Sequence, residues 1–267
     1  MTLTISSPRR ADPSMAEPRI DDLFGGDDPA PVTAAERLLT SFGSSAQTLF
    51  AGLGRRDTVR AVVDLALPTF RCGGVGVVLV DTNSRPVSAG ASGDDAATAD
   101  RLQLSLRQGP VLQAIERRQP VLISELRSDS RWRFWAPGAA DLGFRSALAL
   151  PLADGDISGS VMLYSGSAAH FRSADLAAAM VFAQLASIAV AVAQEREQLL
   201  QALQSRSIVG QAQGILMKLH GVTATQALTV LHRYAAQQDE PLKVLAECVI
   251  RDGGLPDIDA RRPSPAL

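Results

Sequence analysis

Between residues 55 and 173 the hydrophobic positions change their period several times, which predicts a mixture of helices and strands. A helix that Asp57 can cap runs to about Pro68 and has one apolar face: Val59, Val62, Val63 and Ala66. Beyond it the pattern predicts strands at 75–80, 121–124, 145–152 and 157–164, and helices at 95–107 and 111–118. The last two strands flank a turn and predict a hairpin. Because strands and helices do not alternate regularly, we expect an α+β fold, an antiparallel sheet with flanking helices.

From Ser173 onward the pattern is helical. Ser173 can cap a long helix that continues to about Leu219, with Asp175 favourably placed in the first turn. Four residues of this helix have the spacing of a coiled-coil seam, although Glu195 interrupts it: Leu185, Ile188, Val192 and Leu199. We expect this stripe to join two copies of the chain. The alternative is that the stripe packs on the chain's own sheet.

Two short helices follow the long one. His220-Gly221 ends the long helix, since glycine can adopt the left-handed cap conformation, and Thr223–Gln226 forms a capping box for the next helix. Pro241 is expected in the first turn of the last helix. The apolar positions of the two short helices follow helical spacing: Ala227, Leu228, Leu231, then Leu242, Leu245, Ala246, Val249 and Ile250. Such short helices bury little by themselves, so the long helix or a second subunit must contribute.

The two ends of the chain differ from the middle. Residues 1–33 contain five prolines and two pairs of aspartates, which predicts a disordered arm. Residues 253–267 are again rich in glycine and proline, which predicts a flexible tail. Between them we expect two domains, at 34–195 and 196–252.

Composition excludes several classes of protein. Twenty-six basic and 28 acidic side chains give a net charge of −2, so there is no overall attraction to nucleic acid or membrane. Cys72 and Cys248 lie far apart with no partner at metal-ligand spacing, which excludes a disulfide scaffold and a zinc site. Residues 176–193 carry no charge, but Gln184, Ser187 and the lack of basic flanks favour a buried or self-associating helix over a membrane span. With no secretory signal at the N-terminus, we expect a cytoplasmic protein.

Catalytic motifs are missing from the sequence. The glycines of Gly73–Gly76 precede a predicted strand, whereas those of a dinucleotide fingerprint follow one. The three histidines, His170, His220 and His232, are scattered along the chain. The sequence does not bring together a nucleophile, a base and a group that orients the base. We therefore expect no enzyme activity, metal or cofactor. The basic and aromatic residues of Arg131–Trp135 could stack nucleic-acid bases, but tryptophans packed over a sheet edge or pocket are the favoured interpretation.

The C-terminal helices resemble the ANTAR domain, a three-helix RNA-binding module of bacterial transcription antiterminators. The resemblance rests on Ser205–Met217, on Ala227 and Leu231, and on Asp239–Ala246. Its motif residues are Arg206, Val209, Ala212, Gly214, Leu216 and Met217. Upstream, four segments resemble a GAF domain of the actinobacterial type: Gln108–Ala114, Asp129–Trp132, Gly143–Ser146 and Leu150–Leu152.

This pair of resemblances implies a sensor-regulator without catalysis. The GAF-like half would perceive a small molecule or a partner protein, and the long helix would transmit the geometry of a homodimer. The ANTAR-like half would bind paired RNA hairpin loops in leader transcripts and prevent a terminator from forming. The alternative is a dimeric signalling adaptor that binds protein partners without RNA. Neither function involves a membrane.

Some residues depart from the pattern of these families. Gln213 stands where ANTAR domains commonly have Lys, and Asp239 and Pro241 stand where Asn and Lys are frequent. Val111 replaces the frequent Cys of the GAF Gly-Pro-Cys motif, which rules out thiol chemistry there.

The ANTAR-like segment has a weak positive charge. From 206 to 251 it has five basic and three acidic side chains, so hydrogen bonding and stacking must contribute to RNA recognition. The expected RNA-binding residues are Arg206, Gln211, Gln213, Lys218, His232, Arg233 and Lys243. Arg206 could instead form a salt bridge with an acidic neighbour such as Glu240.

Overall fold

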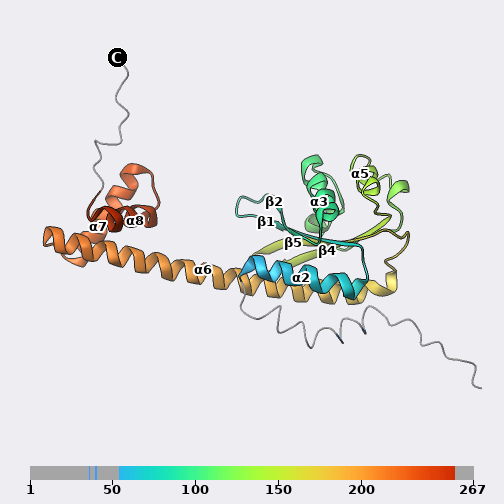
Figure 1. Ribbon diagram of the computed structural model, residues 1–267, viewed down its shortest axis with the longest axis horizontal. Coiled ribbons are helices and arrows are strands. Elements are labelled where there is room, and N and C mark those ends of the chain that lie inside the picture. Colours follow the sequence, from blue (N-terminus) through green and yellow to red (C-terminus); the bar gives the residue numbers. More distant parts are fainter. Residues whose placement is uncertain (1–35, 37–39, 41–53, 256–267) are drawn as a thin grey trace, which may run out of the picture.

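The computed structural model describes Glu36, Thr40 and residues 54–255, shown as ribbon in Figure 1. The arm expected at 1–33 and most of the tail expected at 253–267 lie outside the described residues. The described chain forms a sheet domain, a long helix that leads away from it, and two short helices at the far end of that helix (Figure 1).

The sheet has five antiparallel strands in the order β2-β1-β5-β4-β3. Its strands are β1 (Gly74–Val80), β2 (Pro86–Ala91), β3 (Val121–Ile123), β4 (Ser146–Asp154) and β5 (Ile157–Ser165). The expected hairpin is confirmed as β4–β5, with Asp154 opposite Ile157 and Gly155 at positive φ in the turn. The sequence did not predict β2, an edge strand in which Pro, Ser and Gly weaken the strand pattern.

Helices cover both faces of the sheet (Figure 1). On one face lie α2 (Arg55–Phe70) and the first half of α6 (Leu176–His220). On the other face lie α3 (Asp94–Leu106), α4 (Pro110–Arg117) and α5 (Trp135–Asp141), which we call the outer layer. Short 3-10 turns, η2 (Leu126–Ser128) and η3 (Ser173–Asp175), precede α5 and α6. The α+β class and the antiparallel sheet predicted from sequence are thus confirmed.

The predicted starts of α2 and α6 were wrong in detail. The N-cap of α2 is Gly54, and Asp57 lies in the first turn without a capping hydrogen bond. Helix α6 begins after η3, so Ser173 does not cap it; the Asp175 carboxylate instead accepts a hydrogen bond from the Arg172 backbone. The end of α2 was also placed early, because Pro68 is accommodated within the last turn and the helix continues to Phe70. The ring of Phe70 packs edge-on against that of Phe182 at 5.3 Å, which stabilises this last turn.

Helix α6 turns a face of small residues toward the sheet domain. Ala179, Ala183 and Ala186 are buried there with Phe182, so the helix can approach the sheet closely. The Ser187 hydroxyl donates to the Ala183 carbonyl and accepts from the Ala153 backbone, which joins α6 to β4.

The predicted seam lies on another face of α6. Leu185 and Ile188 are half-buried, while Val192 and Leu199 are 51% and 59% exposed. Leu203, one turn beyond Leu199, is 61% exposed. The alternative in which the stripe packs into the chain's own sheet therefore does not fit the second half of the stripe.

The far end of α6 joins α7 (Ala224–Gln238) and α8 (Leu242–Asp252) in a small three-helix unit (Figure 1). As predicted, α6 ends at His220-Gly221 with Gly221 in the left-handed conformation, and Thr223 with Gln226 forms the capping box of α7. Pro241 is the N-cap of α8 and not part of its first turn.

By length and composition, one helix among the described residues could cross a membrane, the run Ser173–His220. Half of its most apolar window is buried inside the molecule.

Candidate functional site

The three-helix unit has its own apolar core. Side chains from all three helices are fully buried in it: Ala212 and Leu216 of α6, Ala227 and Leu231 of α7, and Leu245, Ala246 and Val249 of α8. Most of these residues come from the apolar positions predicted from sequence. The core fixes the three helices relative to one another, so the polar side chains around it have defined positions.

Gln213 is used within the unit. Its side-chain amide donates a hydrogen bond to the Ala224 carbonyl at 3.0 Å, which connects α6 to the first turn of α7. This carbonyl lies directly after the Thr223 cap, so the bond from Gln213 ties α6 to the capped start of α7.

The predicted RNA-binding residues of α6 fall on two sides of the helix. Gln211 and Lys218 are seven residues apart, share one side and are exposed. Arg206 and Gln213, also seven apart, lie on the opposite flank. The structure therefore does not bring these four side chains together on one helix face.

The remaining predicted residues lie on α7 and α8. His232 and Arg233 are exposed on α7, His232 at the flank of the buried face of Leu231 and Arg233 opposite it. Lys243 is half-buried, and its ammonium lies 3.9 Å from the Glu247 carboxylate, one turn along α8. Arg206 forms no ion pair with Glu240 within the described part of the chain. Lys218, Arg233 and Arg206 are thus open to an anionic partner.

In the sheet domain, the tryptophans of Arg131–Trp135 are buried, as the favoured interpretation expected. Trp135 is fully buried and its indole N–H donates to the Ala99 carbonyl at 3.0 Å, which ties α5 to α3. Trp132 packs edge-on against Trp135, and the Arg131 guanidinium lies over the Trp132 ring at 4.4 Å. Only Phe134 of the three aromatic side chains in this segment is exposed, at 67%.

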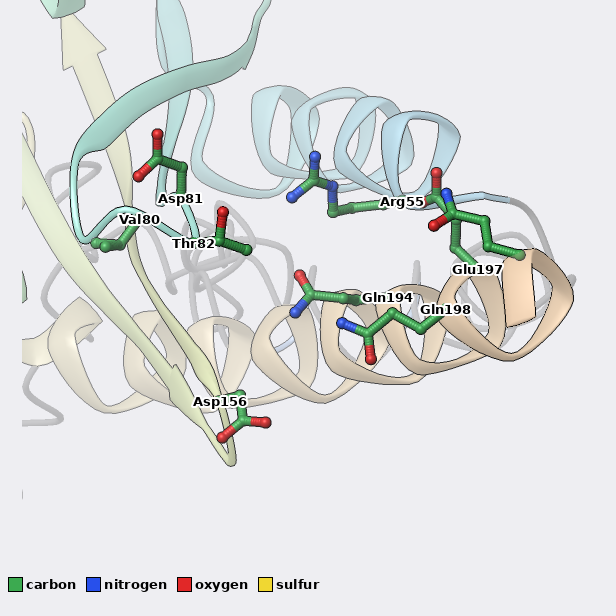
Figure 2. A pocket seen from close by; sticks show the side chains of 9 residues that line it. Arg55, Val80, Asp81, Thr82, Asp156, Gln194, Glu197 and Gln198 are labelled. Atoms are coloured by element: carbon green, nitrogen blue, oxygen red, sulfur yellow. The ribbon is translucent and has the colours of Figure 1, made fainter. Parts of the chain in front are cut away.

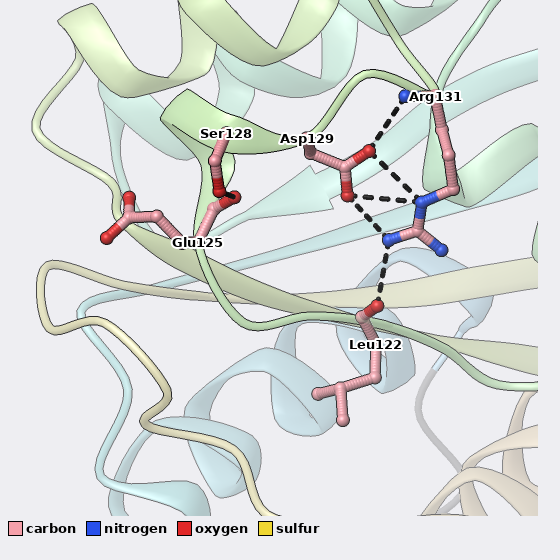
Figure 3. A network of polar contacts seen from close by, with 5 residues as sticks. All are labelled: Leu122, Glu125, Ser128, Asp129 and Arg131. Carbon is pink, nitrogen blue, oxygen red and sulfur yellow. Dashed lines mark hydrogen bonds and ion pairs between the residues drawn. The ribbon is translucent and has the colours of Figure 1, made fainter.

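Arg131 is held in place by the polar network of Figure 3. Its guanidinium donates hydrogen bonds to both carboxylate oxygens of Asp129, the shortest at 2.6 Å. It also donates to the Leu122 carbonyl at 3.0 Å. Burial alone would raise the pKa of Asp129, but the hydrogen bonds from Arg131 outweigh it and hold that pKa below its ordinary value. The network fastens the loop before α5 to strand β3.

A cleft of about 440 Å³ lies where the sheet domain meets the middle of α6 (Figure 2). Asp81 and Thr82 from the β1–β2 turn, Asp156 from the β4–β5 turn and Arg55 from α2 face Gln194, Glu197, Gln198 and Gln201 of α6. The Asp81 carboxylate is already engaged by the backbone N–H groups of Asn83 and Arg85. The cleft is therefore polar, and it is formed by both the sheet domain and the connecting helix.

Sequence reasoning missed one polar cluster. Asp100, Gln103 and Tyr164 are fully buried and hydrogen-bonded to one another beneath the outer layer. The available signal was on α3, where Asp100 and Gln103 occupy the same helical face as the small residues Ala96 and Ala99. Among the described residues, no group of His, Cys, Asp and Glu side chains is arranged to hold a metal ion.

Comparison with known families divides the chain in two. The family model of the GAF domain matches residues 53–191, and that of the ANTAR domain matches residues 197–250. No curated protein matches the chain. The two matched ranges meet within α6, at the level of the cleft in Figure 2.

Solved structures match the sheet domain. The GAF domain from a phosphoenolpyruvate-protein phosphotransferase of Coxiella burnetii is 16% identical with a TM-score of 0.50, covering 60% of this chain and 95% of that one. The corresponding Acinetobacter domain is 16% identical with a TM-score of 0.48, over 58% and 93% of the two chains. A free methionine-R-sulfoxide reductase from Neisseria meningitidis is 18% identical with a TM-score of 0.46, over 60% and 89%. At 16% identity, the likeness to the Coxiella burnetii domain shows the fold alone.

Proposed function

Because the chain belongs to the GAF domain family and carries an ANTAR domain after it, we propose that it is a cytosolic regulator that binds RNA hairpins and causes transcription antitermination. Both domains are regulatory domains. The observation that carries the proposal is a compact three-helix ANTAR domain, with exposed cations, on the end of a helix that is continuous with the GAF domain.

The proposed mechanism needs two ANTAR domains. In a homodimer joined along α6, two domains would bind two hairpin loops of one leader transcript together and keep the terminator strand from pairing. The apolar stripe on α6 supports this arrangement, because Val192, Leu199 and Leu203 are exposed in the single chain. The GAF domain would control it by sensing a small molecule or a partner protein that shifts its contact with α6.

RNA contact should involve few charges. Two to four phosphate contacts per subunit predict that the logarithm of the affinity falls with the logarithm of salt with a slope of about −1.4 to −2.8 for single strands. Lys218, Gln211 and Arg233 are exposed and are the strongest candidates. The bond from Gln213 to Ala224 makes Gln213 the weakest of the residues expected from sequence.

The test is the double variant Lys218→Ala with Lys243→Ala, measured for binding to a two-hairpin leader RNA and for thermal unfolding. We expect at least a tenfold loss of RNA affinity, about 1.4 kcal/mol, with little change in melting temperature. The matched control is Arg56→Ala with Arg60→Ala, which removes two exposed cations of α2 in the GAF domain and should leave RNA affinity unchanged.

A dimeric adaptor that binds protein partners is the second candidate function. It is supported by the small positive charge of the ANTAR domain, where five basic side chains oppose three acidic ones between 206 and 251. If the wild-type protein binds neither paired nor single hairpins, the RNA proposal fails and the adaptor remains. If the wild type binds and the Lys218 and Lys243 variant binds equally well, these lysines are not contacts.

A further inference from the structure

The GAF domain contains a buried carboxyl group that is only half satisfied. Asp100 of α3 is fully buried beneath the outer layer. Its Oδ1 accepts a hydrogen bond from the Tyr164 hydroxyl at 2.7 Å, while its Oδ2 has no hydrogen-bond partner among the residues that the structure describes. Oδ2 lies against Gly76 of β1, so close that a Cβ there would overlap it. The absence of a side chain at Gly76 therefore makes the space that the carboxyl group occupies.

This carboxyl group is connected to three elements of the domain. Tyr164 belongs to β5, and its hydroxyl also accepts a hydrogen bond from the Gln103 amide at 3.2 Å. The Gln103 carbonyl oxygen accepts from the Val111 backbone N–H, in the first turn of α4, at 2.9 Å. Gly109 allows this close approach, because a Cβ at that position would overlap the Gln103 side chain. A single chain of hydrogen bonds thus joins α3, the sheet and the start of α4.

The surroundings disfavour the ionised form of Asp100. A carboxylate can accept about four hydrogen bonds, and the described part of the chain supplies one donor to Asp100. Burial is the main cause that raises the pKa of Asp100 to about 7, against smaller opposing effects from the Tyr164 hydroxyl and Arg101. Burial also raises the pKa of Tyr164 well above its ordinary value, so its hydroxyl stays protonated.

Few other charges act on this site. Strands β1 and β2 carry no ionisable side chain, and Asp154 of β4 lies at the far end of its strand from Ser146. On α3, Arg101 points outward. The other ionisable side chains of the three outer helices are exposed: Asp94, Asp95, Glu116, Arg117 and Asp141.

We propose that Asp100 is a proton-binding site through which the pH of the cell controls how tightly the outer layer packs on the sheet of the GAF domain. With the proton bound, the carboxyl group is neutral and the layer is closed. When the proton leaves, a buried negative charge with one hydrogen bond remains, and the layer opens locally to hydrate it. The proton is then an input to the GAF domain in its own right, independent of any ligand and of RNA.

The test is hydrogen exchange of the full-length chain at pH 6 and pH 8, corrected for the intrinsic pH dependence of amide exchange. We expect amides of α3 and α4 to exchange at least severalfold faster at pH 8 in the wild type, while those of α7 and α8 do not change. In Asp100→Asn, which cannot ionise, α3 and α4 should show no pH dependence. An equal pH dependence in the variant, or none in the wild type, overturns the proposal.

A second measurement does not depend on the variant folding. Infrared difference spectra of the wild type between pH 6 and pH 8 should contain the carbonyl stretch of one buried carboxylic acid, lost as the pH rises. Selective 13C labelling of aspartate assigns the band to that residue type. If no aspartate carboxyl titrates in this range, Asp100 is not a proton-binding site and the proposal fails. Neither measurement involves RNA, so the proposed function stands or falls separately.

Discussion

At the scale of residues, the two polar clusters of the GAF domain follow opposite rules. Asp129 is ionised and is paired with Arg131 through several hydrogen bonds, so its charge is compensated. Asp100 faces a tyrosine hydroxyl and a glycine, so a negative charge on its carboxyl group would not be compensated. Burial without a cation favours the neutral acid, so the pKa of Asp100 is raised from its ordinary value whereas that of Asp129 is lowered.

The first prediction concerns the pH dependence of stability. In the folded chain the pKa of Asp100 is raised to about 7 from an ordinary 3.8, so the folded state holds this proton more tightly than the unfolded state. Its contribution to the free energy of unfolding is complete below pH 3.8 and is lost as the pH rises through 7. Urea unfolding should show the wild type losing a few kcal/mol between pH 5 and 8 at this site, and Asp100→Asn should lack that loss.

The control for this prediction is Tyr164→Phe. It removes the one hydrogen bond to Asp100 but keeps the ring that stacks on Phe144 at 4.6 Å. Because that bond stabilises the ionised form, its loss should move the pH dependence to higher pH. A curve for Tyr164→Phe that coincides with the wild type would show that Asp100 does not cause the slope.

A second prediction at this scale concerns Gln213. Its amide holds the Ala224 carbonyl, so Gln213→Ala should destabilise the ANTAR domain by about 1 kcal/mol, the usual net value of one hydrogen bond. RNA affinity should change little at temperatures where the domain stays folded. Gln211→Ala, two residues away and exposed, is the matched control and should leave stability unchanged. Thermal unfolding and RNA titration of both variants distinguish a structural from a contacting amide.

At the scale of elements, the helices and strands that could be predicted from sequence were those with a strong local pattern. The β4–β5 hairpin was found because its two apolar runs flank a clear turn, and α7 because Thr223 and Gln226 form a capping box. Strand β2 was missed because its hydrogen bonds to β1, and not an alternation of side chains, make it a strand. Long-range contacts, such as Asp100 with Tyr164, leave no local pattern to read.

Helix α6 was also predicted only in part. Its length and its end at Gly221 were predicted, but the sequence left open whether the apolar stripe faces a second copy or the chain's own sheet, because alanine and larger residues alternate around the helix. The structure assigns the alanine face to the sheet and leaves Val192 and Leu199 of the stripe exposed, together with Leu203. A helix with one face buried and another apolar face exposed has a surface available for a second helix.

A third prediction tests that surface. Val192→Asp places a charge in the expected seam, and because Val192 is exposed in the single chain, the GAF domain should keep its melting temperature. Burying an unpaired charge is costly, so self-association should weaken at least tenfold, or about 1.4 kcal/mol, in analytical ultracentrifugation. Ala186→Asp, on the buried face of the same helix, should instead unfold the domain. A wild type that is monomeric at micromolar concentration would contradict the seam.

At the scale of the whole molecule, α6 is one uninterrupted helix of 45 residues that belongs to both domains. The sheet domain fixes its first half, the ANTAR core includes its last turns, and the segment between them contacts neither core (Figure 1). If the first half of α6 rotates about the helix axis, the ANTAR domain at its other end therefore rotates with it. In the proposed dimer, this would set the distance and angle between the two proposed RNA-binding surfaces.

The last prediction uses the period of the helix. Two residues inserted after Glu197 rotate everything beyond by about 200° and put the two halves of the stripe on opposite sides, whereas seven residues restore the phase to within about 20°. We expect the two-residue insertion to weaken binding to a two-hairpin RNA severalfold or more, by preventing both domains from engaging at once. The seven-residue insertion should keep most of it. Affinity for a single hairpin is the internal control and should be equal in both. Equal affinities of the two insertions for the two-hairpin RNA would mean that α6 serves only as a tether, and that dimer geometry has no part in recognition.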